Sequence, residues 1–214
     1  MKFLAKTAIA VAAIAASAAA SAVTITSYSF DGVGAFIKLG ATTEGVGAGE
    51  ITVNTDIGSF ATYCIELTQG LGTPPASGYA FGSYANDLIS RLVDVSGFYG
   101  GIPGVNAVDT TVEKAALQLD IWEAVYDSFP GDLSAGNFSV VNVSAPVLAQ
   151  ANAYLTAADA LAPGSYPTNT LYAFTHRSRQ DLVTSIPEPS TYMLMFAGLA
   201  GMGLVARRRN GQQS

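Results

Sequence analysis

Cys64 is the first residue in this sequence whose type points to covalent chemistry. It is the only cysteine in the 214-residue chain, so it forms no intrachain disulfide. A single cysteine in an exported protein suggests intermolecular pairing, a free thiol or another covalent bond. An inert buried thiol is the alternative. The residue lies in a β-branched and aromatic run, Ser59 to Leu67, which predicts a strand.

Gln118 is the second such residue, because it lies among apolar neighbours. At about 100° per residue, a helix over 111–128 places Gln118 at the centre of an apolar stripe. A buried amide must be hydrogen-bonded. Gln118 therefore either bonds backbone groups in the core or has its amide carbon bonded to another group. The stripe also contains Ala115, Ile121, Trp122, Val125 and Phe129, while Glu113, Asp120, Glu123 and Asp127 are expected on the opposite, polar face.

The two segments together, Tyr63-Cys64-Ile65 and Leu117-Gln118-Leu119-Asp120-Ile121-Trp122, resemble the thioester domains of bacterial surface adhesins. The resemblance extends in element order over about residues 24–176. It implies an internal thioester in which Cys64 supplies the sulfur, Gln118 supplies the acyl group and Trp122 packs beside the bond. The chain departs from the usual pattern at Leu117, where threonine is common, and at Asp120, where alanine is common.

Other catalytic chemistry has little support in the sequence. His176 is the only histidine, and its neighbours Arg177 and Arg179 suggest a surface position rather than a Cys64–His176 pair. No zinc or calcium motif occurs, so we expect no catalytic residue, metal or cofactor. Ten tyrosines on a glycine-rich acidic chain suit a sugar-binding face, although their spacing does not show which of them would form it.

The C-terminal segment has three parts in a fixed order. Pro187-Glu188-Pro189-Ser190 disfavours helix, an uncharged run follows over 191–206, and Arg207, Arg208 and Arg209 end it. The run is about 24 Å long as a helix, so snorkelling arginines must complete a membrane span. The arginines predict that this end lies on the cytoplasmic side.

This order resembles the PEP-CTERM sorting signal of Gram-negative bacteria over residues 187–209. The resemblance implies an exosortase-type transpeptidase as a partner, a transient anchor in the inner membrane, and delivery to the cell surface or the exopolysaccharide matrix. An ordinary C-terminal membrane anchor is the alternative.

Residues 1–22 are predicted to be a secretory signal peptide. Lys2 and Lys6 precede an apolar run, and Ala20-Ser21-Ala22 is a small-residue cleavage site that would make Val23 the first mature residue. Residues 23–187 contain 15 acidic and 5 basic residues, a net charge of −10. That balance argues against nucleic acid as a partner, and 165 residues suit one domain.

The predicted fold class is α+β, an antiparallel sandwich or barrel-like domain over 23–176 with inserted helices. A tether over 177–186 would join it to the sorting signal. We expect the first and last strands to pair. Strands are predicted at 24–30, 35–39, 50–54, 60–67, 138–143 and 171–176, with glycines between the early ones as turns, and helices at 84–96, 111–128 and 145–161.

The sequence thus predicts an exported protein of the cell surface or biofilm matrix that is not an enzyme. An adhesin-like protein that binds surface amines covalently through a Cys64–Gln118 thioester is one alternative. A secreted hydrolase is the other, and it has no base constellation to support it.

Overall fold

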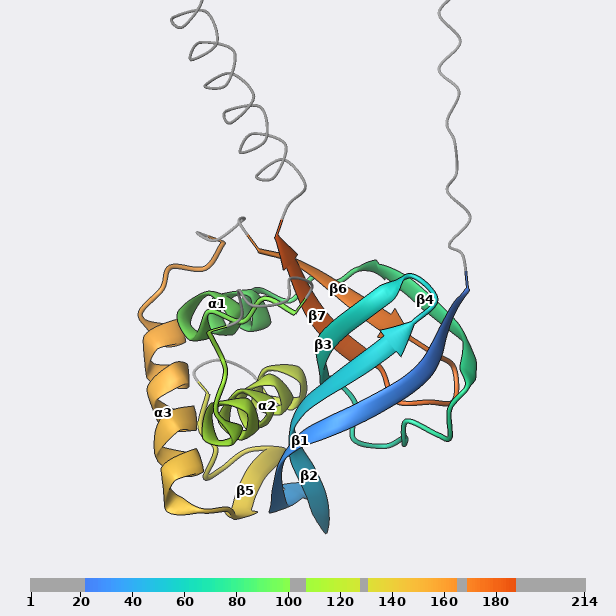
Figure 1. Ribbon diagram of the computed structural model, residues 1–214. Helices are drawn as coiled ribbons and strands as arrows, with labels where there is room; N and C mark the ends of the chain where they lie inside the picture. The colour runs from blue at the N-terminus through green and yellow to red at the C-terminus, as the bar shows by residue number, and fades with distance from the viewer. Residues whose placement is uncertain (1–21, 101–106, 128–130, 165–168, 188–214) are drawn as a thin grey trace, which may run out of the picture.

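The computed structural model describes residues 22–100, 107–127, 131–164 and 169–187, and it shows a strand ring beside three helices (Figure 1). The strand order is β2-β3-β7-β6-β4-β1-β5, and β2 also pairs with β1, so six strands close on themselves. All pairings are antiparallel. The prediction of an α+β fold is confirmed. The elements are β1 (Val23–Leu39), β2 (Thr42–Thr55), β3 (Gly58–Cys64), β4 (Ala76–Ser83), α1 (Asp87–Ser96), α2 (Thr111–Tyr126), β5 (Phe138–Asn142), α3 (Ala145–Asp159), β6 (Asn169–Thr175) and β7 (Leu182–Pro187).

Strands β1 and β2 form one long hairpin, where the sequence predicted several short strands separated by glycine turns. The predicted strands 24–30 and 35–39 are both parts of β1. Gly40 does form the turn, with φ 58°. Gly32 and Gly49 lie opposite each other within the strands. A Cβ on Gly49 would collide with the backbone of Asp31 and Gly32, so these glycines permit a close approach of two strands rather than a turn.

Strand β4 was missing from the prediction, and it changes the topology. It lies between β1 and β6, so the predicted pairing of the first and last strands is wrong. The segment predicted as a tether is also partly a strand, because β7 spans Leu182–Pro187 and pairs with both β3 and β6. Leu182 and Val183 are buried. The folded domain therefore extends to Pro187.

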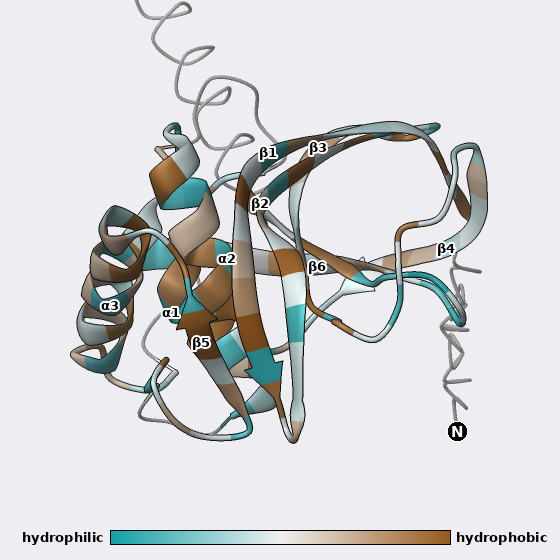
Figure 2. Ribbon diagram, turned by 90° about the horizontal axis from the view of Figure 1, so that it is seen from below, coloured by the Kyte–Doolittle hydropathy of each residue, from teal (hydrophilic) through white to brown (hydrophobic). Residues whose placement is uncertain are grey.

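An aromatic cluster helps to hold the ring together. The Phe60 ring lies 5.4 Å from Phe174 and 5.6 Å from Phe81, measured between ring centroids, and Phe81 and Phe174 are 4.5 Å apart. Because the three rings come from β3, β4 and β6, they join strands that are distant in sequence. Figure 2 looks along the ring, with the helices packed against one side of it.

The three helices lie close to their predicted ranges, because local signals define their ends. The Asn86 side chain caps α1 by accepting a hydrogen bond from Ile89 N–H at 3.0 Å. Thr110 and Glu113 form a capping box at the start of α2. Helix α3 has Pro146 in its first turn.

Helix α2 is buried on all sides along its middle, which corrects the predicted polar face. Asp120 is 0% exposed and Glu123 is 2% exposed. The reason is that α2 packs against β1 and β2 on one side and against α1 and α3 on others. Phe129 of the predicted stripe lies outside the described residues.

The two predicted targeting segments, 1–22 and 187–209, fall almost wholly outside the described residues. Among the residues that the structure describes, no helix has the length and apolar character needed to cross a membrane. Strand β1 begins at Val23, the residue predicted to follow signal-peptide cleavage.

Candidate functional site

The structure brings Cys64 and Gln118 together. Cys64 is the last residue of β3 and pairs with Leu182 of β7. Its backbone N–H donates to Gln118 Oε1 at 2.9 Å, and Gln118 Nε2 donates to the Cys64 carbonyl oxygen at 2.8 Å. Gln118 is 0% exposed, as predicted. At the end of β3, the Gln118 side-chain amide thus bonds to the backbone of Cys64 in the way that a neighbouring strand would.

This pairing explains how a buried amide is tolerated in the core. Both polar atoms of the Gln118 amide have partners, and so do both backbone groups of Cys64. The same two bonds place the amide carbon of Gln118 beside Cys64. Hydrogen bonding to backbone, the first interpretation of Gln118, is thus what the structure shows, while a covalent bond at its amide carbon stays a prediction.

Burial controls the reactivity of the Cys64 thiol. Cys64 is 4% exposed, and desolvation raises its pKa to about 12. Within the part of the chain that the structure describes, no cation lowers that pKa. The thiol therefore differs from the activated cysteines of Cys–His enzymes, which are held as thiolates by a neighbouring positive charge.

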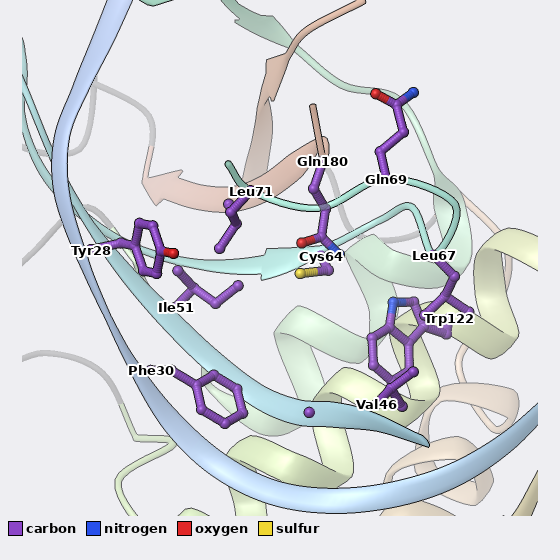
Figure 3. A pocket seen from close by; sticks show the side chains of 11 residues that line it. Tyr28, Phe30, Val46, Ile51, Cys64, Leu67, Gln69, Leu71, Trp122 and Gln180 are labelled. Atoms are coloured by element: carbon purple, nitrogen blue, oxygen red, sulfur yellow. The ribbon is translucent and has the colours of Figure 1, made fainter. Parts of the chain in front are cut away.

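A cavity of about 360 Å³ lies over Cys64. Figure 3 shows the Cys64 sulfur between Trp122 on one side and Tyr28 and Phe30 of β1 on the other. Trp122 is 1% exposed, and its indole Nε1–H has no hydrogen-bond partner within the described part of the chain. Trp122 thus lines the same cavity as Cys64, and its role beside a Cys64–Gln118 bond stays a prediction.

The outer wall of the cavity is aromatic and was not singled out by the sequence. Tyr28 is 40% exposed and Phe30 is 48% exposed. The Phe30 ring lies against Gly47, where a Cβ would come within 3.0 Å of it. The β1–β2 hairpin therefore supplies much of the cavity wall, whereas β3 contributes Cys64 and α2 contributes Trp122.

The segment after β3 closes the cavity and is held by hydrogen bonds to other parts of the chain. Leu67 N–H donates to the Tyr126 hydroxyl at 2.8 Å. Gln180 Nε2 donates to the Glu66 carbonyl at 2.8 Å, and Gln180 N–H donates to the Gly70 carbonyl at 3.1 Å. The β6–β7 connection therefore fixes the cover of the cavity.

His176 lies outside this cavity. Its ring lies against Tyr79, with ring centroids 5.0 Å apart and planes tilted by 48°, and its Nδ1 accepts a hydrogen bond from Ser178 N–H at 3.1 Å. It lines a separate hollow with Gly78 and Asp181. The described residues contain no group of His, Cys, Asp and Glu side chains that would hold a metal ion.

A pair of buried acids occupies a different side of α2. Both carboxylate oxygens of Asp120 lack a hydrogen-bond partner among the described residues, and burial raises the pKa of this group well above its usual value. Glu123 Oε1 accepts a hydrogen bond from Asp132 N–H at 2.8 Å. Desolvation raises the pKa of Glu123 to about 7. Asp120 therefore favours the protonated form in the folded protein, and Glu123 changes its protonation state near neutral pH.

The family model of the PEP-CTERM protein-sorting motif matches residues 185–209, which confirms the resemblance seen at the C-terminus. This match supports an exported protein that an exosortase sorts. No curated protein and no solved structure matches the chain. The motif begins at Ser185, inside β7, and Pro187 is both the last residue of that strand and the first of Pro-Glu-Pro.

Proposed function

We propose that this protein is a non-enzymatic attachment protein of the cell surface or exopolysaccharide matrix of a Gram-negative bacterium. It would acylate an amine once, through a thioester between Cys64 and Gln118, rather than turn over a substrate. The sorting motif supports the location. The observation that carries the chemistry is the double hydrogen bond between the Gln118 amide and the backbone of Cys64.

The geometry suits formation of the bond. The Cys64 sulfur would attack the amide carbon of Gln118, and the C–N bond to Nε2 would break. Ammonia would leave with the thiol proton. Negative charge develops on Oε1 during the attack, and the Cys64 N–H already points at this atom from 2.9 Å. A fixed donor at that place stabilises the tetrahedral intermediate.

The surroundings also suit storage of the bond. The site is buried, so water has little access to the acyl carbon. A thiol with a pKa of about 12 is a poor leaving group, which slows hydrolysis. An amine that entered the cavity would form an amide with Gln118 and return the proton to the Cys64 sulfur.

A hydrolase is less well supported. A cysteine hydrolase needs a base beside the thiol, and His176 lines a different hollow. A simple matrix protein without the bond is the remaining candidate, and it would retain the same fold and the same sorting signal.

Intact mass of the exported protein, before and after methylamine, tests the proposal. A thioester lowers the mass by one ammonia, and methylamine then adds its full mass. The Cys64→Ser variant is the control and should show neither change. A protein of full mass with a titratable Cys64 thiol and no methylamine adduct would reject the thioester. The simple matrix protein without the bond would then be the remaining candidate.

Sorting is tested separately. Replacing Arg207, Arg208 and Arg209 with glutamine should block removal of the C-terminal segment, because the arginines would hold it at the cytoplasmic face. Mature surface protein that still carries these arginines in the wild type would contradict sorting by an exosortase.

A further inference from the structure

We infer that the cavity over Cys64 binds a sugar unit of an amino-sugar polymer and presents the polymer's amine to the site. The covalent part of this inference rests on the proposed thioester, whereas sugar recognition does not. Three features of the cavity carry it: its aromatic wall, its unpartnered indole N–H and its lack of ionic side chains.

The aromatic wall is prepared for stacking. Tyr28 and Phe30 expose close to half of their surfaces and face the cavity from β1 (Figure 3). The bare backbone of Gly47 supports the Phe30 ring from below. The C–H face of a sugar ring is apolar and packs on the electron-rich face of an aromatic ring. Half-exposed aromatic rings at the entrance of a concave site are suited to this kind of contact.

Two polar atoms of the cavity wall lack partners in the described structure. One is the Trp122 indole Nε1–H, a donor on a side chain that is 1% exposed. In Figure 3 this nitrogen lies on the edge of the ring that faces Cys64 and Leu67. The other is Gln69 Oε1, an acceptor, but the Gln69 side chain extends away from Cys64 in Figure 3. The indole N–H is therefore the polar atom that a sugar hydroxyl in the cavity would satisfy, because a hydroxyl oxygen accepts hydrogen bonds.

The charge pattern selects the kind of sugar. Among the described residues, the cavity wall contains no Asp, Glu, Lys, Arg or His side chain, so a permanently charged group would lose its hydration there without a partner. Residues 23–187 nevertheless carry a net charge of −10, which attracts a cationic polymer over longer distances. An amino-sugar polymer meets both conditions, since its amines are partly protonated in solution and a neutral amine is the nucleophile inside.

The volume is also suitable. A cavity of about 360 Å³ is within the range of about 300–1,000 Å³ that is typical of small-molecule sites. In the covalent step, the sugar nitrogen bonds to the Gln118 acyl carbon. The C–S bond to Cys64 breaks, and the sulfur takes up the amine proton.

The experiment measures binding and adduct formation separately on the exported protein. Binding of short N-acetylglucosamine and glucosamine oligomers is measured by calorimetry on Cys64→Ser, which makes no thioester. Adducts with glucosamine oligomers, with methylamine and with a lysine-containing peptide are measured by intact mass on the wild type. Phe30→Ala is the test variant. Phe36→Ala is its matched control, because Phe36 is a 53% exposed aromatic on the same strand that does not line the cavity.

We expect Cys64→Ser to bind both oligomers, and Phe30→Ala to weaken that binding at least tenfold while Phe36→Ala does not. We expect the glucosamine oligomer to form adducts at least tenfold faster than the lysine peptide. If adducts form at all, equal rates for oligomer and peptide would overturn sugar recognition, and so would equal oligomer binding by the Phe30 and Phe36 variants. Oligomer binding without any methylamine adduct would retain sugar recognition and reject the thioester.

Discussion

Removal of β7 should unfold the domain, although its residues resemble a polar linker in the sequence. Leu182 and Val183 are 0% and 1% exposed. Full burial of a Leu or Val side chain contributes about 1.5–3 kcal/mol, so the two together contribute about 3–6 kcal/mol. A typical domain is stable by only about 5–15 kcal/mol. Loss of β7 also opens the strand ring between β3 and β6.

The assay compares a chain over 23–187 with one over 23–181 by urea unfolding, followed by circular dichroism and by the fluorescence of Trp122. The longer chain should unfold cooperatively. The shorter chain should show no cooperative transition, or one at a much lower urea concentration. Equal midpoints for the two chains would refute the assignment of β7 to the folded core.

The same strand limits where an exosortase can cut. The sorting motif begins at Ser185, which is 0% exposed within β7. A cut before Pro187 would remove part of a ring strand, so we expect the C-terminus of the mature protein to lie at Pro187 or beyond. Mass spectrometry of the C-terminal peptide of the surface form checks this, and a C-terminus within 182–186 would contradict it.

Three further substitutions test the packing of the domain by urea unfolding. Burial raises the pKa of Asp120 and Glu123 in the folded state, so the stability that they contribute is fully present below their unfolded pKa values and is lost as pH rises towards 7 and above. Asp120→Asn should make the decline in stability from mildly acidic to neutral pH less steep, and an unchanged slope would contradict this. Gln118→Ala leaves two buried backbone groups of Cys64 without partners and should cost about 1–3 kcal/mol for each, whereas a loss below about 1 kcal/mol would show that the pairing contributes little. Gly49→Ala should destabilise by about 1–3 kcal/mol because its Cβ meets backbone, while Gly34→Ala, with open space around it, serves as the control and should have little effect.

The helices could be predicted from the sequence because their signals are local. Thr110 and Glu113, which are three residues apart, form the capping box that starts α2, and Asn86 caps the start of α1. The burial of Gln118 followed from its apolar neighbours on one helix. The meeting of Cys64 with Gln118 came only from the resemblance to thioester domains, because it joins residues 54 positions apart.

The features that the sequence analysis missed depend on contacts between residues that are distant in the sequence. Glycine is common in turns, so Gly32 was predicted to separate two strands. It instead lies within the continuous strand β1, opposite Gly49 of β2. Thr184 and Ser185 are polar yet buried, because β7 lies between two other strands. The helical periodicity placed Asp120 on the predicted polar face of α2, but strands and helices pack around α2 on several sides and bury it. Tyr28 lines the cavity because the folded sheet brings β1 close to Cys64, and nothing in the sequence near Tyr28 indicates this contact.

The bond between Cys64 and Gln118 is tested most directly by peptide mapping of the exported protein under non-reducing conditions at mildly acidic pH. Trypsin cuts on either side of both residues and separates peptides 39–91 and 115–177. With the thioester present, we expect the two peptides to be found joined, with a mass lower by one ammonia than their sum, or hydrolysis during digestion to leave a glutamate in place of Gln118. Two separate peptides, one with a free thiol and the other with an intact Gln118 amide, would contradict it.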